Sequence, residues 1–179
     1  MIRINNELRD RAYRIACEHG FHDKEYSDEH YLMLIITEIS EVVQADRKGK
    51  KANIDAFERL YSGSDSKFGY EKLIMGSVED ELADVVIRCL DFAGLRNIDI
   101  DFSTLPVFTD KSLSLIDNLF AISIIIYGAK ATVTLYHKIN RIIVSTLCLA
   151  KQLNIDLCWH IEQKMKYNEL RPRLNGKKY

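Results

Sequence analysis

The segment VEDELADVVIRCLDFA, residues 78–93, indicates an α-helical fold. Its apolar residues recur every three or four positions, which is the period of an amphipathic helix with one buried face. Glu81 and Asp84 are displaced to one side of that apolar stripe. The pattern predicts a buried helix that carries two acids along one edge.

The segment LMLIITEISEVV, residues 32–43, repeats this geometry with Glu38 and Glu41 on the flank of its stripe. Acids three residues apart on a helix repel each other by a few tenths of a kcal/mol unless a cation offsets the repulsion. Two facing pairs would form an all-oxygen site, and hard oxygen ligands suit Mg²⁺ or Mn²⁺. Since Mg²⁺ completes its shell with water and substrate phosphates, the four acids indicate phosphate chemistry.

The helical period continues almost throughout the chain, and only Pro106 and Pro172 interrupt it. We therefore expect a single all-α domain over residues 1–179, a helical bundle of about six helices. The expected helices are 5–20, 28–49, 69–95, 110–127, 131–153 and 155–170. The Gly- and Ser-rich stretch 53–69 is interpreted as a mobile loop or lid with at most a short helix over 55–60.

The composition is that of an ordinary globular protein, with 47% hydrophobic and 28% charged residues. A net charge of −1 argues against binding to nucleic acid or to an anionic membrane. The longest apolar run, 119–127, is far short of the roughly 18 residues that span a bilayer. The four cysteines show no CxxC spacing, so free thiols and a reducing, cytoplasmic location are expected.

A cationic face is predicted near the C-terminus. Lys164, Asn168 and Arg171 recur at i, i+4 and i+7, with His160 and Tyr167 on the same side. Arginine offers a planar fork for phosphate oxygens and lysine a point charge. Lys177 and Lys178 could close over a polyphosphate from a flexible tail. The alternative is a solvated basic helix end that the helix dipole favours.

Two aromatic residues, Trp159 and Tyr31, could stack on a nucleobase, although an aromatic beside an apolar stripe is more often part of a core. His30 and His160 are interpreted as polar contacts. The chain contains no E-x-x-H motif, which argues against the di-iron carboxylate bundles.

E-x-x-E followed by E-x-x-D on two successive helices, then KMKYNELRPRLNGKKY, resembles the MazG-like all-α nucleoside triphosphate pyrophosphohydrolases, which are relatives of the dimeric dUTP pyrophosphatases. The resemblance covers residues 32–47, 78–93 and 154–179. It implies that Glu38, Glu41, Glu81 and Asp84 hold Mg²⁺ and that the protein hydrolyses a nucleoside triphosphate to the monophosphate and pyrophosphate. Lys164, Tyr167, Asn168, Arg171, Lys177 and Lys178 are then the expected substrate-binding residues.

The chain departs from this family in region 100–153, which is either an insertion or a decayed second copy of the acid-bearing helix pair. Asn97-Ile98-Asp99 recurs as Asn154-Ile155-Asp156, and Ile39-Ser40 as Ile122-Ser123. In this alignment Glu38 and Glu41 correspond to Ala121 and Ile124, and Glu81 and Asp84 to Lys138 and Arg141. The second half therefore cannot hold Mg²⁺, and its apolar runs should be buried between the halves or between subunits.

Three functional hypotheses follow from these patterns. The first is a Mg²⁺-dependent nucleoside triphosphate pyrophosphohydrolase in nucleotide-pool sanitation, which the four acids and the basic helix favour together. The others are a catalytically silent nucleotide-binding or regulatory module and a carboxylate-bridged redox metalloprotein. A homodimer is favoured over a monomer because the chain is rich in apolar helix surface.

Overall fold

The computed structural model describes residues 3–61, 66–103, 109–127 and 134–176, and these residues form an all-α fold. The α-helices are α1 (Asn6–Glu18), α2 (Asp28–Arg47), α3 (Ile54–Tyr61), α4 (Ser66–Leu73), α5 (Val78–Leu95), α6 (Leu115–Tyr127), α7 (Leu135–Gln152) and α8 (Leu157–Glu169). A short 3₁₀-helix, η1 (Arg173–Gly176), follows. The all-α prediction is confirmed.

Polar caps start the helices that carry the predicted site. Ser27 accepts a hydrogen bond from His30 N at the start of α2, and Ser77 accepts one from Asp80 N at the start of α5. Acidic residues occupy the first turn of both helices, where the positive end of the helix dipole favours them. Asp156 caps α8 in the same way through Trp159 N.

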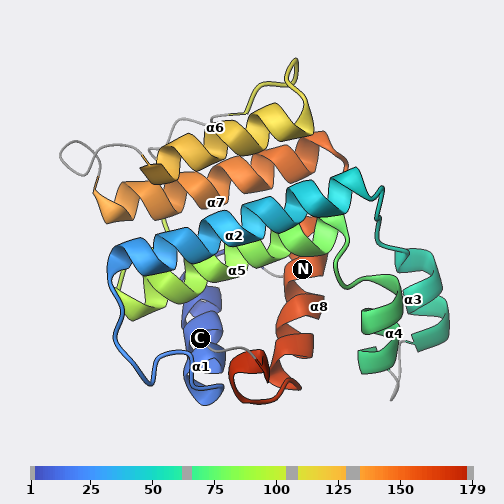
Figure 1. The fold of residues 1–179 in the computed structure, drawn as a ribbon, viewed down its shortest axis with the longest axis horizontal. Helices are drawn as coiled ribbons and strands as arrows, with labels where there is room; N and C mark the ends of the chain where they lie inside the picture. Colours follow the sequence, from blue (N-terminus) through green and yellow to red (C-terminus); the bar gives the residue numbers. More distant parts are fainter. Residues whose placement is uncertain (1–2, 62–65, 104–108, 128–133, 177–179) are drawn as a thin grey trace.

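The centre of the fold is α5, which packs against α1, α2, α7 and α8. Its apolar stripe is sealed from solvent, and Val78, Leu82, Val86 and Leu90 are all fully buried. Figure 1 shows α6 and α7 on one side of α2 and α5, with α1 and α8 crossing on the other side and α3 and α4 at one end. Because its neighbours pack closely around α5, the polar groups that project from this helix are held in fixed positions.

The helices α2, α5, α6 and α7 form a bundle in which α6 packs on α7 and α2, and α7 packs on α5. The expected packing of the second helix pair against the acid-bearing pair is confirmed.

The last helix of each pair, α5 in the first and α7 in the second, ends with the same backbone geometry. Asn97 and Asn154 both have positive φ, 51° and 58°, and the following residues, Ile98 and Ile155, donate from N to the carbonyls of Ala93 and Ala150. Both helices therefore close with the same C-terminal motif.

One expected helix, 69–95, is wrong because the chain breaks between α4 and α5. Gly76 has a φ of 74°, a conformation that other residues rarely adopt, and Ser77 starts a new helix. The expected loop at 53–69 is also wrong in part. The short helix that was allowed over 55–60 corresponds to α3, but the first half of α4 lies in this stretch as well, and the two helices pack as a pair. Phe57 and Tyr70 anchor this pair in a small second core with Tyr167.

The remaining helix ends differ from the expected ones by a few residues, and α6 begins at Leu115 where 110 was expected. The four cysteines are free thiols. In the described parts of the chain, no single helix is both long and apolar enough to cross a membrane. Only α7 and α8 taken as a pair meet that length and composition, and the pair is bent by 116°.

Candidate metal centre

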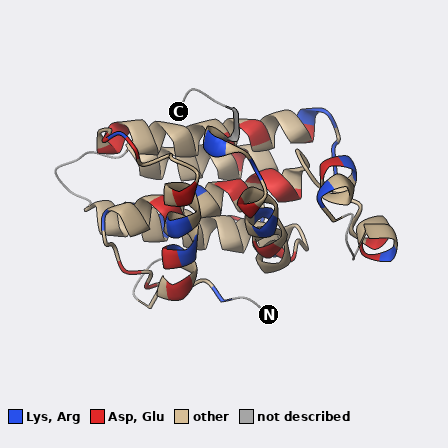
Figure 2. Ribbon diagram, turned by 90° about the horizontal axis from the view of Figure 1, so that it is seen from below, with Lys and Arg blue, Asp and Glu red and all other residues tan. Residues whose placement is uncertain are grey.

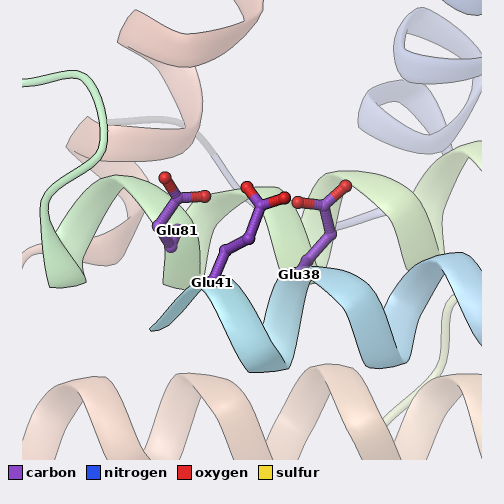
Figure 3. Close-up of side chains that lie close together, drawn as sticks. All are labelled: Glu38, Glu41 and Glu81. Carbon is purple, nitrogen blue, oxygen red and sulfur yellow. The ribbon is translucent and has the colours of Figure 1, made fainter. Parts of the chain in front are cut away.

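Three of the four predicted acids converge on one point. Glu38 and Glu41 project from α2 and Glu81 from α5, and each offers a carboxylate oxygen that lies within 4.8 Å of the other two (Figure 3). The carboxylates point away from α7, towards the side of the bundle that α1 and α8 cover. Figure 2 shows acidic positions gathered where α2 and α5 lie side by side. The spacing of the two motifs thus produces one shared site.

The fourth acid, Asp84, lies one turn beyond Glu81 but pairs with a cation. Its Oδ2 is 2.6 Å from Nζ of Lys164, a residue of α8 that is itself buried. Burial raises the pKa of Asp84 to about 7, although Lys164 opposes this shift. The structure therefore places Asp84 beside the three glutamates and outside their cluster.

The electrostatics of the glutamate cluster fit a bound cation. Burial and the neighbouring Asp84 carboxylate raise the pKa of Glu81 to about 8. Its Oε2 is buried and has no hydrogen-bond partner among the described residues. A buried acceptor without a partner is costly, and a divalent ion would satisfy it. Three converging carboxylates with no nitrogen or sulfur donor fit a hard ion such as Mg²⁺ or Mn²⁺.

A buried aspartate that the sequence reading missed holds Lys164 in place. Asp80 is fully buried, accepts hydrogen bonds from Gly76 N (2.8 Å) and the Tyr70 hydroxyl, and pairs with Lys164 Nζ at 2.9 Å. Lys164 thus bridges Asp80 and Asp84, and their charges raise its pKa against the effect of burial. Its ammonium group fixes α8 against the start of α5.

A second cation near the cluster was also missed as a site residue. Arg88 donates from Nε to Glu38 Oε1 at 2.9 Å, and its guanidinium lies 5.5 Å from the Phe21 ring. It follows Glu81 by seven residues on α5, so helical spacing alone places both on one face. That spacing is the signal that could have identified Arg88.

The cluster opens into a cavity of about 210 Å³. Its walls include the four acids, Arg88, and the α8-side residues Lys164, Asn168 and Arg171. Small side chains of α1, Ala12 and Ala16, also line the cavity. Asn168 Oδ1 is buried and lacks a partner among the described residues. Acids for a metal and cations for an anion therefore share one cavity.

Tyr167, another predicted substrate contact, does not line this cavity. Tyr167 lines a separate groove beside Phe57 and donates to Glu71 Oε1 at 3.1 Å. Lys177 and Lys178 lie outside the described residues. His160 is buried, neither ring nitrogen has a hydrogen-bond partner in the described chain, and burial lowers the pKa of its imidazole.

The two aromatic residues considered for base stacking pack against other side chains. Trp159 meets the Phe57 ring edge-on, with centroids 5.8 Å apart. Tyr31 stacks on Phe92 at 5.0 Å in the main core. Neither lines the metal cavity.

In the predicted alignment of the two helix pairs, Lys138 and Arg141 of α7 correspond to Glu81 and Asp84 of α5. Lys138 is buried on α7 and donates from Nζ to the Ile126 carbonyl at 3.1 Å, near the end of α6. The expected counterparts of Glu38 and Glu41 are Ala121 and Ile124, which carry no ligand atoms. Common ancestry of the two halves stays a prediction.

Comparison of the chain with models of protein families, with curated proteins and with solved structures gives no match.

Proposed function

We propose that the protein is a Mg²⁺-dependent nucleoside triphosphate pyrophosphohydrolase that releases a nucleoside monophosphate and pyrophosphate. One observation carries the proposal: the acid cluster of Glu38, Glu41 and Glu81 opens into the same cavity as Arg88 and Arg171. Acids alone fit any divalent ion, and cations alone fit any anion. Their combination supports a substrate that brings metal-bound phosphates. The resemblance of both acid motifs to MazG-like enzymes favours the same reaction.

In this proposal the three glutamates hold the metal, which when bound neutralises charge on the phosphate oxygens. Arg88 and Arg171 offer guanidinium groups to the polyphosphate, and Lys164 positions α8 through Asp80 and Asp84. Water adds across the α–β anhydride bond: one P–O bond forms, the bridging P–O bond breaks, and the water loses a proton. Asp84 lines the cavity outside the cluster and has a pKa of about 7, so it suits the role of proton acceptor.

The direct test is product analysis with a panel of ribo- and deoxynucleoside triphosphates, in Mg²⁺ and in EDTA. We expect equal amounts of monophosphate and pyrophosphate in Mg²⁺ from at least one nucleotide, and no turnover in EDTA. Glu41→Gln and Glu81→Gln should lower kcat/KM more than about 100-fold, because each removes a metal ligand. Glu18→Gln, which alters an exposed acid of α1, is the matched control. Turnover that is unchanged in both cluster variants would refute the assignment.

A further inference from the structure

The outer face of α6 is an apolar stripe in contact with solvent. Ile116, Phe120, Ile124 and Tyr127 follow one another at intervals of four, four and three residues, so they share one helix face. They are 40%, 68%, 55% and 91% exposed. The opposite face of α6 is buried in the bundle through Leu119, Ile122, Ile125 and Ile126. The run 119–126, which was expected to be buried between the halves or between subunits, is therefore buried within this chain on one side only.

We infer that this α6 stripe is the interface of a homodimer, in which α6 of one copy packs antiparallel on α6 of a second copy. The stripe runs over about 16 Å at 1.5 Å per residue. A two-fold axis across its middle makes it complementary to itself, because each copy presents the same apolar residues to the other. Ala121 and Ser123, which flank the stripe and are half-buried, allow the two helices to approach closely.

The charges of α6 favour a second copy over other occupants. Asp117 is the single charged residue between Ser112 and Tyr127. Antiparallel packing places the two copies of Asp117 at opposite ends of the interface, so like charges do not meet. Helices that lie on membranes carry Lys or Arg on their polar face, and residues 112–127 include neither.

The exposed area is sufficient for a weak to moderate dimer. Because an aromatic side chain buries about 150–250 Å², Phe120 and Tyr127 offer about 300 Å² and the isoleucines raise this to about 500 Å² per copy. Two copies would bury about 1,000 Å², the lower limit of specific interfaces. Since α6 lies on the far side of the bundle from α1 and α8, both metal cavities would stay open (Figure 1).

The test is sedimentation equilibrium of the full chain over a concentration series. We expect the wild type to have the mass of two chains at high micromolar concentration. Phe120→Glu and Ile124→Glu should each raise the dimer dissociation constant at least tenfold. Leu60→Glu, at an equally exposed apolar residue of α3, should leave it unchanged. Circular dichroism checks the folding of each variant, and Tyr127→Ser is the milder substitution if a glutamate variant does not fold.

Three results would overturn the inference. These are a wild-type monomer throughout the series, a dimer that the α6 variants leave intact, and binding of the wild-type monomer to phosphatidylcholine vesicles that Phe120→Glu abolishes.

Discussion

Replacing Lys164 with methionine removes the cation that joins two buried carboxylates. Its Nζ lies 2.9 Å from Asp80 Oδ2 and 2.6 Å from Asp84 Oδ2, and Asp80 is fully buried. Breaking a buried ion pair leaves uncompensated charge, so the free energy of unfolding should fall by about 3–5 kcal/mol at alkaline pH. Methionine keeps an unbranched stem, which limits the contribution of a new cavity.

The loss should depend on pH because Asp84 can take up a proton. The pKa of Asp84 is about 7 while Lys164 holds it down, and it rises further without the cation. At pH 6 the carboxyl is mostly neutral in both proteins, so its pairing with Lys164 contributes less. At pH 8.5 the wild type gains the full pairing and the variant does not. We therefore expect a smaller loss at pH 6 than at pH 8.5.

Urea unfolding in metal-free buffer, followed by circular dichroism, measures both values. The matched control is Lys166→Met, two residues further along α8, where the side chain is 56% exposed and 3.6 Å from Glu162. An exposed pair of this kind contributes about 0.3–0.5 kcal/mol. If Lys164→Met costs no more than Lys166→Met at pH 8.5, the buried triad does not hold α8 in place.

Three further predictions follow from the site and the fold. The pKa values of Glu81 and Asp84 are about 8 and about 7, above their ordinary values. Between about pH 5 and pH 8 these two groups therefore hold more protons in the folded protein than in the unfolded chain. Thermal melting in EDTA should therefore show stability falling as pH rises through that window, with Mg²⁺ restoring it at pH 8; stability that rises instead would contradict the buried cluster. Asn97→Ala and Asn154→Ala should each cost about 1–2 kcal/mol in urea unfolding, because alanine tolerates positive φ poorly, and a loss at only one site would show that the two helix ends differ. Arg171→Ala should lower kcat/KM for the nucleotide, and Arg171→Lys should not restore it because the guanidinium fork is lost. Full recovery of kcat/KM with lysine would show that Arg171 acts only through its positive charge.

Local pattern was enough to predict the acid cluster, since residues three apart on one helix must share a face. It was not enough to separate Asp84 from the glutamates. Its partner, Lys164, comes from a helix 80 residues later, and the side from which α8 approaches α5 depends on tertiary packing. Asp80 was missed for the same reason. Other acids surround it in the sequence, and Asp80 differs from them only in the groups that it contacts in the folded protein.

The break between α4 and α5 could have been predicted. A helix-start pattern is present there, with Gly76 followed by Ser77 and then by the acids Glu79 and Asp80. The apolar period continues across this pattern, so one uninterrupted helix was predicted. The exposed stripe on α6 could not have been predicted from its sequence. The sequence of an apolar helix is equally compatible with burial of the whole helix and with burial of one face. Only the packed bundle shows which face stays exposed to solvent.

We claim that Glu38, Glu41 and Glu81 form a divalent metal site, and Mn²⁺ binding measured by electron paramagnetic resonance is the test of this site. We expect the wild type to bind Mn²⁺, Mg²⁺ to displace it, and Glu41→Gln and Glu81→Gln each to weaken binding at least tenfold, with Glu18→Gln unchanged. Wild-type protein that binds no Mn²⁺, or cluster variants that bind it as tightly as the wild type, would contradict the claim.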